Sequence, residues 1–180
     1  MRYVRRRYVK QKTNEYILKK LMVVMFIGSI LGALFFCIID SSIIEKISGF
    51  IENFLAIQKS NDIKFIHYFE TILKGIKYLL FIWFLAYIPL GDTFIYIIVF
   101  AKGFFISFTT SAFFYKYGIK GIVYIFNTYI LQNIVIIFLI FYISYVGIDY
   151  YKNSRYIEIK NYIRKLVIVL AIYLILSLII

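Results

Sequence analysis

Apolar stretches long enough to cross a lipid bilayer dominate this sequence. They lie at about residues 21–39, 76–115, 119–148 and 163–180. A helix needs roughly 20 apolar residues to span the hydrocarbon core of a membrane, so the stretch at 76–115 is long enough for two crossings. Hydrophobic residues make up 63% of the chain, against roughly 45–50% in soluble domains. The sequence therefore predicts an all-α protein, a polytopic bundle of helices in a membrane.

A turn is expected to divide the longest stretch at Pro89, Gly91 and Asp92. Proline removes a helix hydrogen-bond donor and glycine relaxes the backbone, so helices should end and begin here. A second short connection contains Gly118 and Gly121, and it should make the next two helices antiparallel neighbours. The single domain 1–180 then has about five transmembrane helices, at about 21–39, 73–89, 93–115, 119–148 and 163–180.

Basic residues are concentrated in the arm at 1–20 and in the connection at 152–165. The positive-inside rule places both segments on the cytoplasmic side of the cell membrane, with the C-terminus outside. Although the net charge is +12, the arm adjoins a span, so it indicates a topology determinant touching anionic lipid headgroups rather than a nucleic-acid site. A basic docking site for a protein partner is the alternative.

The segment at 40–74 is predicted to lie outside the membrane as an amphipathic helical hairpin. Apolar residues recur there at helical spacing, and a turn-rich break at 59–62 separates two stripes. The first stripe includes a candidate packing or partner surface at Ile47, Phe50, Ile51 and Phe54. Such helices could lie in the headgroups, pack on the bundle or hold a partner. The carboxylates of the segment, Glu52 among them, are expected to be solvated.

Lys102 and Gly103 fall near the middle of one predicted span, and no acid accompanies the lysine there. A charge at that depth costs at least about 2.5–3.5 kcal/mol on insertion scales, so the protein must receive it internally. Gln132 and Asn133 of the next span are the expected receivers, and Thr109 adds to this intramembrane polar core. The core could be purely structural, could be completed by a partner, or could form part of a proton or ion path.

Gly28 and Gly32 lie one helical turn apart in the first span, which allows another helix to approach closely. Packing within the chain and self-association into a homo-oligomer are both open. Chemistry of other kinds has little support, because the chain has one His and one Cys. We therefore expect no catalytic residues, no metal site and no cofactor.

Several residues of the third and fourth predicted spans follow one another in a fixed order, namely Lys102-Gly103, Phe108-Thr109, Phe113, Gly118, Gly121 and Gln132-Asn133. Their order and spacing resemble the core signature of the stage II sporulation protein M family. Leu131 stands where that family usually has proline, and Ser107 where it usually has glycine. The layout of spans, basic arm and outer segment is also similar, so the resemblance covers nearly the whole chain.

The resemblance implies a non-catalytic scaffold in the mother-cell membrane at the sporulation septum. A protein of this kind recruits and localises membrane-anchored cell-wall hydrolases, an amidase/endopeptidase and a lytic transglycosylase, which thin septal peptidoglycan during engulfment. The alternative is a small permease-like transport component, with Lys102, Gln132 and Asn133 lining a polar path. The absence of a recognisable inverted repeat in the sequence weighs against that alternative.

Overall fold

The computed structural model describes residues 2–59, 61–125, 131–153 and 159–179. Every regular element in these ranges is an α-helix, which confirms the all-α part of the prediction for the described part of the chain. The helices are α1 (Arg2–Ile38), α2 (Ser41–Lys59), α3 (Asn61–Leu85), α4 (Gly91–Tyr117), α5 (Ile119–Ile125), α6 (Leu131–Asn153) and α7 (Ile159–Ile179).

Two helical segments in the described ranges are long and apolar enough to cross a membrane, Glu15–Ile38 in α1 and Gly91–Tyr117 in α4. A shorter apolar segment covers Val135–Tyr151 in α6. These segments agree with the expected membrane association. The remaining predicted spans, and with them the count of five, stay predictions.

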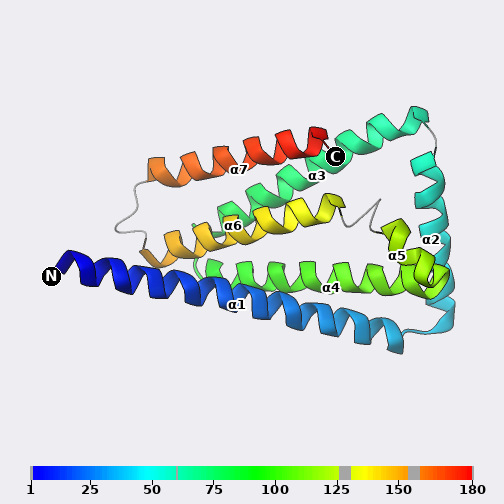
Figure 1. Cartoon of the computed structure of the whole chain (residues 1–180), viewed down its shortest axis with the longest axis horizontal. Helices are drawn as coiled ribbons and strands as arrows, with labels where there is room; N and C mark the ends of the chain where they lie inside the picture. The colour runs from blue at the N-terminus through cyan, green and yellow to red at the C-terminus, as the bar shows by residue number, and fades with distance from the viewer. Residues whose placement is uncertain (1, 60, 126–130, 154–158, 180) are drawn as a thin grey trace.

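The long helices run side by side along the longest axis of the molecule, and α2 lies across the end far from the N-terminus (Figure 1). A single apolar core joins α1, α3, α4, α6 and α7 and excludes solvent from the middle of the bundle. Its fully buried members include Leu21, Leu79, Ile95, Ile143 and Val169. The basic arm belongs to the same helix as the first predicted span, because α1 is unbroken from Arg2 to Ile38.

The closest helix pair in the structure is α1 with α4, and two glycines of α1 allow the two backbones to approach. Gly28 and Gly32 are buried, and a Cβ atom on either would overlap the backbone carbonyl oxygen of Phe100 or Phe104 in α4. Small residues allow helix backbones to approach in this way. Of the two alternatives for these glycines, the structure shows packing within the chain, so the surface that they offer is already occupied.

The predicted turn after the second span is present between Leu85 and Gly91. Leu90 has a positive φ of 63°, and a Cβ at Gly91 would overlap the carbonyl oxygen of Leu85. Glycine is therefore required here for close approach of the backbone to itself. The N–H of Leu90 donates to the hydroxyl of Tyr151 on α6 at 3.1 Å, which ties the turn to a neighbouring helix.

Other boundaries differ from those predicted. The second amphipathic stripe of the 40–74 segment and the predicted span at 73–89 form one helix, α3, because no proline interrupts 61–85. In this helix, a Cβ at Gly75 would overlap the hydroxyl of Tyr173 on α7. The predicted fourth span at 119–148 contains α5 and most of α6, and its residues 126–130 lie outside the described ranges. At the connection before it, Gly118 has a φ of 58° and Gly121 packs against the Phe113 carbonyl.

Candidate functional site

The most distinctive surface of the molecule is α2, which covers one end of the bundle (Figure 1). One face of α2 packs into an apolar cluster, which we call the end cluster. Its buried members come from four helices, so α2 is held by α1, α4 and α5 together. They are Phe36, Ile51, Ala112, Phe113 and Ile125, with Ile44, Ile47, Leu55, Phe108 and Tyr117 packed around them.

Lys116, near the end of α4, holds α2 by polar contacts. Its Nζ lies 2.8 Å from Oε1 of Glu52 and also donates to the carbonyl oxygen of Ser48. The Lys116 side chain is only 14% exposed, whereas that of Glu52 is 66% exposed. Lys116 also lies in the last turn of α4, where a cation is favoured by the helix dipole. Glu52 is solvent-exposed, as the sequence predicted, and it also has an ion-pair partner that sequence spacing does not reveal, because Lys116 lies on a distant helix.

The predicted stripe at Ile47, Phe50, Ile51 and Phe54 does not form one packing face. Ile51 is buried and Ile47 is partly buried in the end cluster, but the Phe50 side chain is 76% exposed. The side chain of Phe54 lies outside the described part of the structure. Ile43 is exposed as well and lies two helical turns before Phe50, so both fall on the same outward edge of α2. The helix therefore packs with one face and leaves an apolar edge uncovered.

Lys102 lies half-buried on α4, and the structure shows an aromatic neighbour for its charge. The Lys102 Nζ lies 5.9 Å from the centroid of the Tyr78 ring of α3. This is within the range of a cation–π interaction. The Tyr78 hydroxyl donates to the carbonyl oxygen of Ile98 at 3.4 Å, which helps to hold the ring beside α4. Sequence reasoning missed Tyr78, although Tyr78 and Lys102 lie equally far in sequence from Leu90 at the turn.

The predicted receivers of the lysine, Gln132 and Asn133, lie in the first turn of α6, and their side chains are outside the described part of the structure. Their pairing with Lys102 stays a prediction. Thr109 is half-buried on α4, two helical turns beyond Lys102. Gly103 serves packing instead, because a Cβ there would overlap the carbonyl oxygen of Met25 in α1.

A hydroxyl strengthens the same contact between α1 and α4. Ser29 Oγ donates to the carbonyl oxygen of Met25 at 3.0 Å and lies 3.4 Å from that of Gly103. Interhelical hydrogen bonds of this kind contribute about 0.6 kcal/mol on average in membranes. One interface between α1 and α4 thus contains Gly28, Gly32, Ser29 and Gly103. Gly103 was predicted to belong to the polar core, and it instead packs in the same interface as the two glycines of α1.

An aromatic stack that sequence reasoning did not predict joins α3, α6 and α7. The Tyr162 ring lies parallel to those of Trp83 and Tyr150, with centroids 5.2 Å and 4.2 Å away. The Tyr162 hydroxyl donates to the carbonyl oxygen of Trp83 at 2.9 Å. Burial raises the pKa of Tyr162, so this donor keeps its proton at neutral pH. The contacts explain why Tyr162 is fully buried at the start of α7.

Asp149 on α6 is a buried acid, only 3% exposed. The sequence-based expectation of solvated carboxylates covered only the 40–74 segment and did not include Asp149. Asp149 lies one helical turn after Tyr145 and near the end of α6, well beyond the depth of Lys102. Its position directly after the apolar run that ends at Ile148 is the sequence signal that could have identified it.

Within the described ranges, no group of three or more His, Cys, Asp or Glu residues is placed to hold a metal ion. Comparisons of this chain with protein-family models, with curated proteins and with solved structures find no match. The resemblance noted in the sequence therefore stays a prediction.

Proposed function

We propose that this protein is a non-catalytic membrane scaffold that recruits peptidoglycan hydrolases for septal wall thinning and engulfment during endospore formation. The sporulation context and the identity of the partners depend on the sequence resemblance described above. The scaffold role has its own structural support, which is the arrangement of α2. The helix is held on the bundle by the end cluster and Lys116, yet its edge at Ile43 and Phe50 has no cover within the described chain.

An ordered helix with an uncovered apolar edge suits a docking role. Because α2 shares the end cluster with residues of α1, α4 and α5 and pairs with Lys116, a partner that binds it pays little to order it. Aromatic residues are the usual anchors of protein interfaces, and Phe50 is a large one. Its place at one end of the bundle would bring a partner close to the membrane surface. This observation carries the proposal.

The proposed topology has five spans, with the N-terminus and the 152–165 connection in the cytoplasm and α2 and the C-terminus outside. A Cys37→Ser background removes the one native cysteine, after which single cysteines at Lys46, Asp92, Lys120 and Lys160 report on sidedness. In intact cells, a membrane-impermeant maleimide should label the cysteines at Lys46 and Lys120 and leave those at Asp92 and Lys160 unlabelled. Permeabilised cells, in which all sites should react, are the control. Labelling of Lys160→Cys in intact cells would contradict the five-span topology.

Phe50 provides the direct test of docking. Phe50→Ser should leave the protein at its normal level in the membrane, because the side chain makes few contacts within the chain. Loss of an aromatic anchor worth about 2 kcal/mol should reduce co-purification of wall hydrolases from sporulating cells more than tenfold. The matched control is Phe81→Ser on α3, which removes an exposed phenylalanine away from α2.

Two outcomes would count against the scaffold. If Phe50→Ser captures wall hydrolases as well as the wild type does, then α2 is not the docking surface. If the wild-type protein captures none, and the purified protein moves a solute across reconstituted vesicles, the transport alternative replaces the scaffold. Ile51→Ser separates folding from docking, since it should lower the protein level by opening the end cluster.

A further inference from the structure

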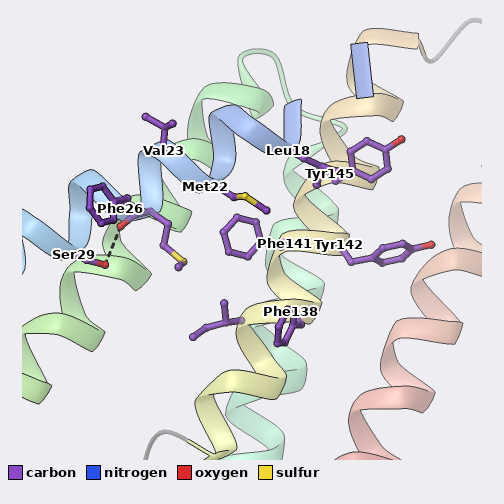
Figure 2. Close-up of a pocket in the computed structure, with 11 residues that line it drawn as sticks. Leu18, Met22, Val23, Phe26, Ser29, Phe138, Phe141, Tyr142 and Tyr145 are labelled. Carbon is purple, nitrogen blue, oxygen red and sulfur yellow. Dashed lines mark hydrogen bonds between the residues drawn. The ribbon is translucent and has the colours of Figure 1, made fainter. Parts of the chain in front are cut away.

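A groove lies between α1 and α6 on the side of the bundle away from α2. Its volume is about 1070 Å³, at the upper end of the usual size of ligand sites. Figure 2 shows the two helices close together at Leu18 and Tyr145 and farther apart toward Ser29 and Phe138. The groove is therefore wedge-shaped, and it follows the apolar part of both helices.

The walls of the groove are apolar and bulky. The lining side chains include Met22, Phe26, Phe138 and Phe141 (Figure 2), and no glycine or alanine is among the lining residues that the structure describes. Ser29 is the hydroxyl at the wide end, and it already donates to the carbonyl oxygen of Met25. The only polar side-chain atoms among the described lining residues are the hydroxyls of Ser29, Tyr142 and Tyr145, so the groove favours a largely apolar occupant.

The size of the lining side chains indicates which kind of molecule fits the groove. A partner helix, or a second copy of this chain, needs small residues at the contact so that the backbones can approach. The glycines of α1 that would allow such an approach, Gly28 and Gly32, face α4 instead. Flexible methionines and aromatic rings can adapt to an acyl chain, which is thin and has no backbone to pack.

Basic residues of α1 lie beyond the narrow end of the groove. Lys19 is exposed, directly follows Leu18 and lies seven residues before Phe26, so it falls on the groove side of α1. Arg5 and Lys12 precede Lys19 at the same seven-residue spacing on the same unbroken helix. Glu15 is the one acid of this arm. Lys20 is placed elsewhere, with its Nζ 4.4 Å from the centroid of the Tyr96 ring on α4.

We infer that this groove binds an anionic phospholipid, with an acyl chain between α1 and α6 and the phosphate group beside Lys19. Exposed Lys19 supplies the charge complementarity to the phosphate group, and the bulky apolar lining supplies the fit to a hydrocarbon chain. The inference needs membrane association of the protein but does not depend on the scaffold role.

Native mass spectrometry of the full chain in detergent tests the inference, with phosphatidylglycerol and phosphatidylcholine as probes. The wild type should bind the first phosphatidylglycerol more tightly than phosphatidylcholine. Lys19→Gln should weaken phosphatidylglycerol about fivefold and leave phosphatidylcholine unchanged. The control Lys74→Gln, an exposed lysine of α3, should change neither. Equal binding of the two lipids by the wild type, or no effect of Lys19→Gln, would overturn the inference.

A second variant tests the groove itself. Met22→Trp fills it and should abolish tight binding of both lipids, whereas Ile168→Trp on the outward side of α7 should not. Unchanged elution and unchanged Trp83 fluorescence would show that the fold of Lys19→Gln is intact. In Met22→Trp and Ile168→Trp the added tryptophan obscures the Trp83 signal, so elution alone reports on their fold. Unaltered lipid binding by Met22→Trp would overturn the inference, as would a wild-type dimer that excludes lipid, since a second copy would then cover the groove.

Discussion

Replacing Gly28 and Gly32 with leucine is expected to separate α1 from α4 and to leave little folded protein in the membrane. Any Cβ at these positions overlaps backbone carbonyl oxygens of Phe100 and Phe104, and backbone atoms cannot rotate aside as a side chain can. Overpacking costs about 1–3 kcal/mol at each site where the structure can adjust. The double variant should therefore lose about 2–6 kcal/mol from overpacking alone, a large part of a typical stability of about 5–15 kcal/mol, and more as other contacts between α1 and α4 are lost.

Membrane protein level in cells and thermal unfolding in detergent measure this effect. Gly49→Ala is a matched control, because Gly49 is also helical and has no atom within 4 Å of the position of an added Cβ. That change should stabilise the protein by about 0.5–1 kcal/mol through helix propensity alone. Normal levels of the Gly28→Leu, Gly32→Leu variant would show that these glycines do not pack against α4, and would make them available to a partner.

Lys102→Glu is expected to have the second large effect. The substitution reverses the charge beside the Tyr78 ring, whose face attracts cations and repels anions. A carboxylate within the bundle must also be desolvated without a cation shown beside it, at a cost of several kcal/mol. The variant should accumulate at a small fraction of the wild-type level, as measured by immunoblot of the membrane fraction.

Lys102→Met is the informative control, since it keeps the length of the side chain and removes the charge. It should accumulate normally, and a double-mutant cycle with Tyr78→Leu should give a coupling of about 0.5–2 kcal/mol between Lys102 and Tyr78. Wild-type levels of Lys102→Glu would show that this side chain reaches water. Normal accumulation of Lys102→Met with loss of hydrolase capture would indicate that a partner reads the polar core.

The helical class and the turn at Pro89 to Asp92 were predictable because their causes are local. A proline lacks a backbone donor wherever it stands, and the crowding at Gly91 arises from Leu85, a few residues away. Apolar periodicity likewise identified α2 as amphipathic, with Ile47 and Ile51 among its packing residues. The spacing of Gly28 and Gly32 indicated a close helix contact for the same reason, since one turn of helix places both on one face.

Which partner each face meets was decided only by the tertiary structure. The glycines of α1 could have faced another chain, and they face α4 because Gly103 and Ser29 complete that interface. Phe50 belongs to the same apolar stripe of α2 as Ile51, yet it is exposed. The face of α2 that contacts the end cluster is narrower than this stripe. Such contacts join residues far apart in sequence.

The polar residues show the same division. Sequence reasoning correctly marked Lys102 as a costly residue that needs a neighbour, because the cost follows from depth in an apolar segment. It did not identify Tyr78, nor the pair of Lys116 with Glu52, nor the burial of Asp149. Periodicity specifies which face of a helix is apolar, whereas the neighbour of a charge depends on how several helices pack at once, and only the folded bundle determines that.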